Sequence, residues 1–102
     1  MPNQTRNHLK RKKMADYYFT FRQSDTENAG KYVKITASNA YEARDEMVRR
    51  HGKSWAMCYS EDEWFTDPDD RWWPYICRLH NINPKRDEPV SQAEIYGLER
   101  IE

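Results

Sequence analysis

Apolar and polar residues alternate along two segments near the start of the chain, residues 16–22 and 31–37. Period-2 alternation is typical of a strand with one face toward a core. A short polar connection that ends at Gly30 separates the two segments, which predicts an antiparallel pair. The apolar face of this pair would carry Tyr17, Phe19, Phe21, Val33, Ile35 and Ala37.

The spacing of apolar residues then changes and predicts a helix from Ala40 to His51. Asn39 precedes it as a capping residue, Glu42 is placed three residues later as a capping-box partner, and Gly52 provides a left-handed stop. The apolar stripe of this helix consists of Ala40, Ala43, Met47 and Val48.

A third strand is predicted over residues 54–60. Both of its faces are apolar enough for a central strand, and the preceding helix favours a right-handed crossover that makes it parallel to residues 31–37. Strict alternation would place Trp55, Met57 and Tyr59 on one face, with Trp55 and Met57 against the helix, and Ala56 and Cys58 on the other.

The last third of the chain is less regular. Residues 71–79 are rich in aromatic side chains, but Pro74 lacks an amide donor, so we expect an edge strand or an irregular packed segment. A polar loop follows over residues 81–89. Ser91 can cap a short helix that Gly97 ends, and residues 98–101 can add a strand.

These elements predict one small α+β domain over residues 15–102, with a β-β-α-β core, an aromatic irregular segment and a short C-terminal helix or strand. Only 37% of the 102 residues are hydrophobic, but 14% are aromatic, and large rings supply core area. The chain has no run of apolar residues long enough to span a membrane and no apolar segment behind its basic start. We therefore expect a cytoplasmic protein.

The net charge of zero hides a separation of charge. Residues 1–14 carry five bases and no acid, whereas the remaining 88 residues carry 12 bases and all 17 acids. The basic head has too few apolar residues to fold and is predicted to be disordered. Met14 directly precedes the first strand, so it is also a candidate translation start, which would make the head a translated leader.

Two kinds of partner follow from this separation. The acidic stretch from Glu61 to Asp70 surrounds aromatic residues, which is the anatomy of a surface that binds a basic protein. The predicted protein-binding residues are Tyr59, Glu61, Asp62, Glu63, Trp64, Phe65 and Asp67. Alternatively, Trp64 and Phe65 fold inward and the acids only solvate an edge.

The other partner class is nucleic acid. Lysine and arginine neutralise phosphates, and an aromatic ring beside an arginine can stack on a base. The candidate residues are Lys10, Arg11, Lys12 and Lys13 in the head, with Arg71 and Trp72. The net negative body opposes this interpretation, and Trp72 and Trp73 are expected to serve mainly as packing.

Candidate chemistry is sparse. Cys77 and His80 have ligand-like spacing, and Cys58 and His51 would complete a zinc set, but no paired Cys-x-x-Cys motif is present. Acidic neighbours disfavour Cys58 as a nucleophile. We expect no metal, no cofactor and no catalytic residue, hence no enzyme. The sequence does not decide whether Cys58 and Cys77 are free, bridged or metal-bound, and it does not give the oligomeric state.

Several stretches resemble a family of small phage and prophage proteins of Gram-positive bacteria. The similar segments are YYFTF at 17–21, YVKITA at 32–37, YEARDEM at 41–47, HGKSWAM at 51–57, YSEDEW at 59–64 and the closing YGLERI at 96–101. Members of that family mostly have no assigned function, so the resemblance carries over no functional residue. It implies an accessory protein that acts inside a bacterial host, and we expect it to bind a host protein with a basic surface, inhibiting a defence or nucleic-acid-handling complex.

Overall fold

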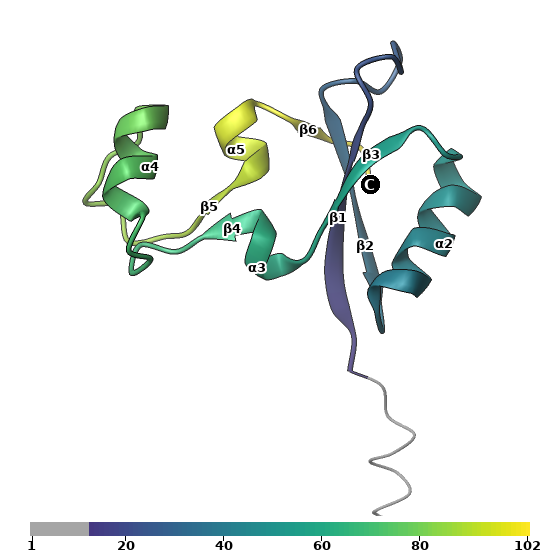
Figure 1. Cartoon of the computed structure of the whole chain (residues 1–102), viewed down its shortest axis with the longest axis horizontal. Helices are drawn as coiled ribbons and strands as arrows, with labels where there is room; N and C mark the ends of the chain where they lie inside the picture. The colour runs from purple at the N-terminus through teal and green to yellow at the C-terminus, as the bar shows by residue number, and fades with distance from the viewer. Residues whose placement is uncertain (1–12) are drawn as a thin grey trace, which may run out of the picture.

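The computed structural model describes residues 13–102, and it has the α+β architecture that the sequence predicts (Figure 1). Residues 1–12, which hold most of the predicted basic head, lie outside the described residues. The elements are β1 (Ala15–Phe21), β2 (Lys31–Ala37), α2 (Ala40–His51), β3 (Trp55–Tyr59), α3 (Glu61–Trp64), β4 (Phe65–Thr66), α4 (Trp73–His80), β5 (Val90–Ser91), α5 (Gln92–Tyr96) and β6 (Glu99–Arg100).

The main sheet has the strand order β3-β1-β2-β6. The β1–β2 pair is antiparallel, as predicted, with Phe19 opposite Val33. Because β1 also pairs antiparallel with β3, strands β2 and β3 run in the same direction. The predicted central position of β3 is wrong, since α2 carries the chain across β1 and leaves β3 at the edge.

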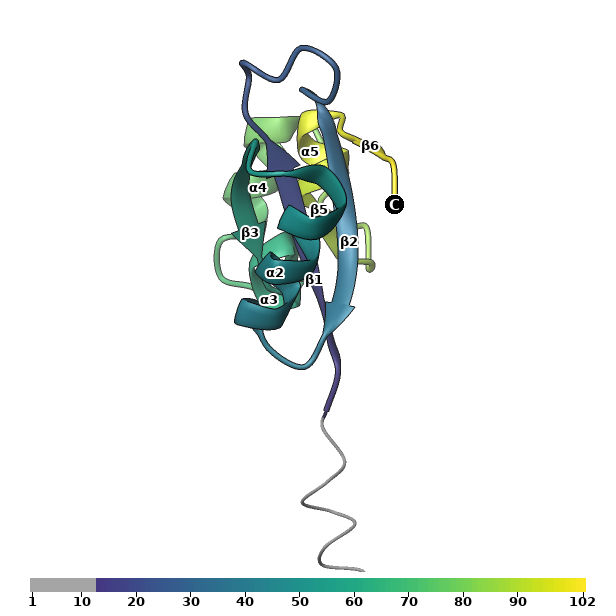
Figure 2. The ribbon, with the colours of Figure 1, turned by 90° about the vertical axis from the view of Figure 1, so that its right-hand side faces the viewer.

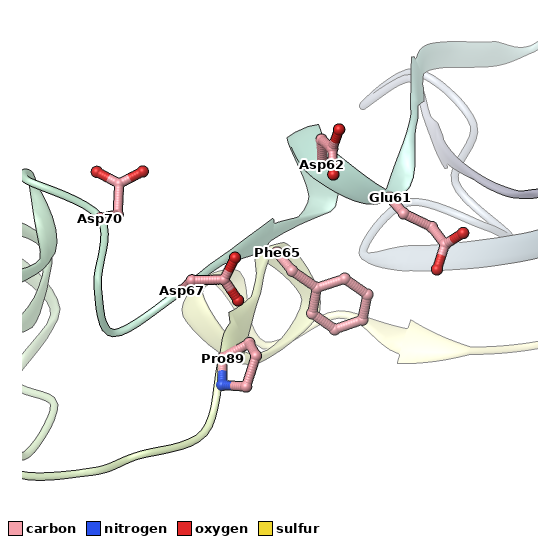
Figure 3. Close-up of a pocket in the computed structure, with 6 residues that line it drawn as sticks. All are labelled: Glu61, Asp62, Phe65, Asp67, Asp70 and Pro89. Carbon is pink, nitrogen blue, oxygen red and sulfur yellow. The ribbon is translucent and has the colours of Figure 1, made fainter.

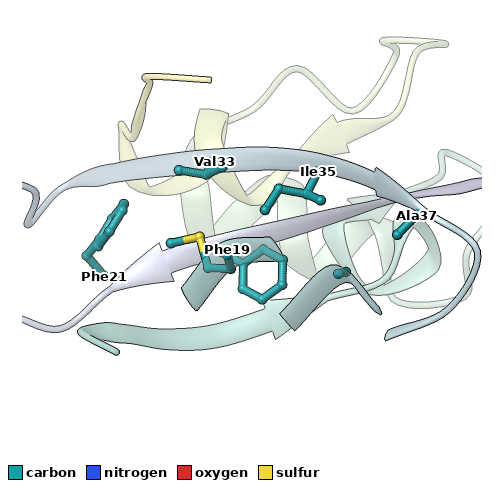
Figure 4. Packing of buried hydrophobic residues seen from close by; sticks show 7 residues of the cluster. Phe19, Phe21, Val33, Ile35 and Ala37 are labelled. Atoms are coloured by element: carbon teal, nitrogen blue, oxygen red, sulfur yellow. The ribbon is translucent and has the colours of Figure 1, made fainter. Parts of the chain in front are cut away.

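Helix α2 covers one face of the sheet and closes the larger core (Figure 4). Asn39 caps the helix by accepting a 2.9 Å hydrogen bond from the Glu42 amide, and the Glu42 carboxylate accepts one from the Ser38 hydroxyl. The helix ends at Gly52, whose φ of 79° favours glycine. The buried residues of this core are Phe19, Phe21, Val33, Ile35, Ala37, Ala43 and Met47.

A bulge in β3 overturns the predicted facing of that strand. Thr20 pairs with Met57, but the next residue of β1, Phe21, pairs with Trp55, so β3 has one extra residue. An extra residue on one strand shifts the alternation of its side chains beyond that point. Trp55 and Cys58 therefore contact the core under α2, whereas Met57 is exposed, contrary to the prediction that it packs against the helix.

A second, smaller core lies on the other side of the sheet, where Figure 1 shows α3, α4 and α5 opposite α2. Its buried residues are Trp73, Cys77 and Val90. The radius of gyration is 17.0 Å, whereas about 13 Å is usual for a compact domain of this length. The molecule is thus elongated, and it is thin when turned by 90° (Figure 2).

Residues 73–80 form a helix, not the edge strand or irregular segment that the sequence suggested. Pro74 lies in the first turn of α4, where an amide has no intrahelical acceptor and proline is well tolerated. Asn81 ends the helix in a left-handed conformation, and its amide donates to the Cys77 carbonyl. The short C-terminal helix and the last strand occur as predicted, with the Ser91 hydroxyl accepting from the Glu94 amide at 3.1 Å.

Glu102 ties the end of the chain to α2. Its carboxylate lies 2.6 Å from Arg50 Nη1 and 2.7 Å from His51 Nε2. Burial acts to raise the pKa of Glu102, but the hydrogen bonds from Arg50 and His51 outweigh it and lower the pKa. A lowered pKa means that the folded state favours the ionised carboxylate.

The Glu102→Gln variant should therefore lose stability in a pH-dependent way. The contribution of Glu102 is present above the unfolded-state pKa and is lost as the pH falls through the lower folded-state pKa. We expect a deficit of about 0.5 kcal/mol at pH 7, since the pair is solvent-screened. Urea unfolding at pH 7 and at pH 3 measures it; an equal deficit at both pH values would contradict the ion-pair explanation.

Within residues 13–102, no helix has the length and apolar character needed to cross a bilayer.

Candidate binding surface

The acidic segment begins as the short helix α3, which is held by a capping box. The Ser60 hydroxyl accepts from the Glu63 amide at 3.3 Å, and the Glu63 carboxylate accepts from the Ser60 amide at 2.9 Å. This reciprocal pair satisfies two amides at the start of the helix. The Glu63 side chain therefore has a structural role, although Glu61, Asp62 and Glu63 are all exposed.

Trp64 anchors α3 to the face of the sheet opposite α2. Its ring is 1% exposed and stacks on Tyr18, with centroids 4.7 Å apart and planes 3° from parallel. Tyr32 and Tyr59 approach the same ring, with centroids at 5.0 and 5.3 Å. Burial raises the pKa of the Tyr18 hydroxyl, and the charges of Asp16 and Glu61 add to the effect. We call these four residues the aromatic cluster.

After Trp64, the chain forms β4, which pairs with a segment far away in the sequence. Strand β4 pairs antiparallel with β5, with Phe65 opposite Ser91 and Thr66 opposite Val90. This pairing brings residues 87–89 alongside the turn at residues 67–70, where the Asp70 amide donates to the Asp67 carbonyl at 3.0 Å. Asp70 also caps the next turn, because its carboxylate accepts from the Trp72 amide at 2.8 Å.

A groove of about 500 Å³ opens between these segments (Figure 3). A neighbouring hollow of about 470 Å³ shares Asp67 and Pro89 with it. Among residues 13–102, no lysine, arginine or histidine lines either hollow. Together they form what we call the acidic groove, lined by Glu61, Asp62, Phe65, Asp67, Pro68, Asp69, Asp70, Asp87 and Pro89.

The acidic groove combines six carboxylates with a small apolar surface. The carboxylates come from α3, from the turn at residues 67–70 and from Asp87. Phe65 is 37% exposed and lines the groove beside Pro89. Such a surface can attract a cationic group and offer an aromatic ring to its aliphatic stem.

The structure divides the seven residues predicted to bind protein. Four of them line the acidic groove: Glu61, Asp62, Phe65 and Asp67. Trp64 is interior rather than a surface anchor, Tyr59 is half-buried against it, and Glu63 belongs to the capping box. The alternative prediction was that both Trp64 and Phe65 fold inward. It is confirmed for Trp64 and wrong for Phe65.

Two of the five groove residues that the sequence prediction missed, Asp87 and Pro89, are remote in sequence from the acidic run. Asp87 and Pro89 approach the acidic turn only because β4 pairs with β5. Each of these strands has two residues, which is too short for a recognisable alternation. Asp69 and Asp70 were visible as part of the acidic run, but nothing local indicated that they share a groove with Asp87.

The two adjacent tryptophans at the start of α4 have different environments. Trp73 is buried, and its indole nitrogen donates to the Pro84 carbonyl at 3.1 Å. Trp72 is 56% exposed, with the Arg71 guanidinium 5.1 Å from its ring centroid and Tyr75 packed edge-on at 6.3 Å. The expectation that both serve mainly as packing thus fits Trp73 alone. Of the predicted basic residues, Lys13 is exposed, and Lys10, Arg11 and Lys12 lie outside the described residues.

The cysteines and histidines considered for metal binding are dispersed. Cys58 contacts the larger core and Cys77 lies in the smaller one, and both are free thiols. Residues 13–102 contain no group of three or more potential ligands positioned around one ion. Burial raises the pKa of the Cys58 thiol; Arg44 opposes this effect, and Glu63 adds to it. A raised pKa leaves less of the nucleophilic thiolate at neutral pH.

The chain matches no protein-family model, no curated protein and no solved structure. The resemblance to small phage and prophage proteins therefore stays a prediction from the sequence.

Proposed function

We propose that this protein binds a basic surface of another protein through the acidic groove and has no catalytic role. The observation that carries the proposal is the groove itself: six carboxylates from three separate segments surround Phe65 and Pro89, and no basic residue of the described range 13–102 lines the hollow. Carboxylates around exposed apolar atoms can both steer a basic partner and hold it. The antiparallel pairing of β4 with β5 brings Asp87 to the acidic groove.

The resemblance to phage proteins suggests which class of partner protein carries the basic surface. We propose an accessory protein of a phage or prophage that acts in the cytoplasm of its bacterial host. Proteins that handle nucleic acids bear basic surfaces that fit phosphates. An array of carboxylates competes for such a surface, so inhibition of a defence or nucleic-acid-handling complex is the expected consequence.

Reversal of three groove charges tests the proposal. In the full-length chain, Asp62, Asp67 and Asp69 are exposed groove residues whose replacement by lysine avoids both the capping box and the Asp70 cap. We expect affinity for the partner to fall at least tenfold, largely through slower association. The measurement is capture from bacterial lysate on immobilised protein, quantified by mass spectrometry at two salt concentrations.

A matched control keeps the same change in net charge. Lysine replacements at Glu27, Asp45 and Glu99 reverse three exposed acids away from the groove. The control should retain the captured protein at the wild-type level. If both triple variants lose it equally, binding depends on net charge alone and the groove is not the site.

A second candidate function is supported by the surface at the start of α4, which Arg71, Trp72 and Tyr75 form. An arginine over an exposed tryptophan ring, with a second ring at its edge, is a platform on which nucleic-acid bases can stack. If this function holds, a fluorescent single-stranded oligonucleotide should bind with steep salt dependence, and Trp72→Ala should weaken it. Groove reversal would then strengthen binding, because it removes negative charge near the phosphates.

A further inference from the structure

The start of β1 lies at one end of the acidic groove. The Asp16 amide nitrogen is 3.5 Å from Glu61 Oε1, and Tyr18 in the same strand stacks on Trp64 of α3. Figure 3 shows Glu61 at the end of the groove next to the main sheet and Asp70 at the opposite end. The chain that precedes β1 is therefore attached beside the carboxylates of the groove.

The segment that precedes β1 carries the complementary charge. Residues 1–14 hold five bases and no acid, and four of these bases stand together over residues 10–13. The groove presents six carboxylates, and no basic residue of the described range 13–102 lines it. A basic segment attached next to an acidic groove is attracted to it, and salt weakens that attraction.

The length of the basic head also suits the groove. An extended chain spans about 3.3–3.6 Å per residue, so residues 10–15 reach up to about 20 Å and residues 1–15 up to about 50 Å. Inside the groove, Phe65 and Pro89 offer an apolar surface to the aliphatic stems of lysine and arginine. A segment that has too few apolar residues to fold alone can still bind through charge.

We propose that the basic head occupies the acidic groove of its own chain and competes there with the basic partner. The inference rests on the proposed function, because it assigns a regulator to the same groove. A segment on a short tether is present at an effective concentration of about 1 mM. With an intrinsic dissociation constant of about 0.1 mM, the head would leave about one groove in ten open and weaken partner binding about tenfold. Only a surface that binds the carboxylates better than the tethered head then displaces it.

Amide chemical shifts of the full-length, ¹⁵N-labelled chain test whether the head occupies the groove. In the head variant, Lys10, Arg11 and Lys12 are replaced by glutamine. We expect the amides of the groove residues to shift relative to wild type at low salt. The difference should vanish at about 0.5 M salt, where charges act over only about 4 Å. Groove amides that the head variant leaves unchanged at low salt overturn the proposal.

A matched variant removes the same charge from the body of the protein. Arg22, Lys53 and Arg78 are exposed and line neither hollow of the groove, so their replacement by glutamine lowers the net charge by the same amount. Groove amides should keep their wild-type shifts in this control. Equal shifts of the groove amides in the two variants would reflect net charge alone and would also overturn the proposal.

A fluorescent synthetic peptide with the sequence of residues 1–14 measures the competition. By fluorescence anisotropy, it should bind the head variant about tenfold more tightly than it binds wild type or the matched variant. Adding lysine replacements at Asp62, Asp67 and Asp69 to the head variant should abolish this binding. Equal affinity of the peptide for wild type and for the head variant contradicts occupation of the groove by the head.

These outcomes are distinct from a failure of the proposed function. That function fails when reversal of the groove charges leaves the captured partner bound, whatever the head does. The proposal for the head fails when groove amides and peptide affinity do not respond to the head bases, even where groove reversal abolishes capture of the partner.

Discussion

Replacing Trp64 with alanine is expected to cost about 3–5 kcal/mol of unfolding free energy, among the largest effects expected of a single substitution in this chain. The ring is almost fully buried and stacks on Tyr18, so alanine would leave a large cavity between α3 and the sheet. A domain of this size has a total stability of about 5–15 kcal/mol, so the variant should be close to unfolding. Urea unfolding followed by circular dichroism measures the difference.

Trp72→Ala is the matched control for Trp64. It removes the same side chain from an exposed position and should cost under about 1 kcal/mol. Equal losses in the two variants would contradict the placement of Trp64 inside the aromatic cluster. Because α3 supplies Glu61 and Asp62 to the acidic groove, Trp64→Ala should also reduce partner binding.

Trp73→Ala is expected to unfold the small core while the sheet and α2 remain folded. Trp73 is 4% exposed and is the largest of only three buried residues in that core, so its loss removes most of the contacts that hold α4. The expected cost is about 3–5 kcal/mol of unfolding free energy. This loss exceeds the stability of the small core alone, so that core should unfold locally. Amide hydrogen exchange should show lost protection in α4 with unchanged protection in β1, β2 and α2.

Trp73→Phe serves as the conservative variant. It keeps an aromatic ring but loses the hydrogen bond to the Pro84 carbonyl, so it should cost about 1–2 kcal/mol and keep α4 folded. If Trp73→Ala instead lowered protection uniformly over both cores, the molecule would be one cooperative unit, and the description of two separate cores would be wrong.

Local signals predicted the first half of the fold well. Alternation located β1 and β2, and Asn39 and Gly52 marked the ends of α2. Alternation failed in β3 because a bulge depends on the register with β1, and Phe21 pairing with Trp55 has no signature in the β3 residues themselves. The outward turn of Met57 could not be predicted from that strand alone.

The prediction of an edge strand or irregular segment over residues 71–79 was wrong because it rested on Pro74. Proline disfavours both a central strand and a helix interior, but it is well tolerated in the first turn of a helix. The spacing of Trp73, Ile76, Cys77 and His80 is helical and would have supported α4, with Asn81 as its left-handed end. Pro74 thus lies at the start of a helix and does not interrupt a strand.

The sequence predicted the negative charge of the candidate site but not the full set of residues that line the groove. The acidic run located Glu61, Asp62, Phe65 and Asp67, which do line the groove. The burial of Trp64 depends on the rings of Tyr18 and Tyr32, which belong to strands far away in the sequence. Asp87 and Pro89 became groove residues only through long-range pairing of β4 with β5.

The central claim is that the acidic groove contacts a basic partner. Its most direct test is an amide chemical-shift map of the full-length, ¹⁵N-labelled protein, titrated with the protein captured from lysate. The predicted result is that the largest shifts cluster at Asp62, Phe65, Asp67 and Asp87, and that they weaken as salt rises. Shifts centred on Arg71, Trp72 and Tyr75, with the groove unchanged, would contradict the claim.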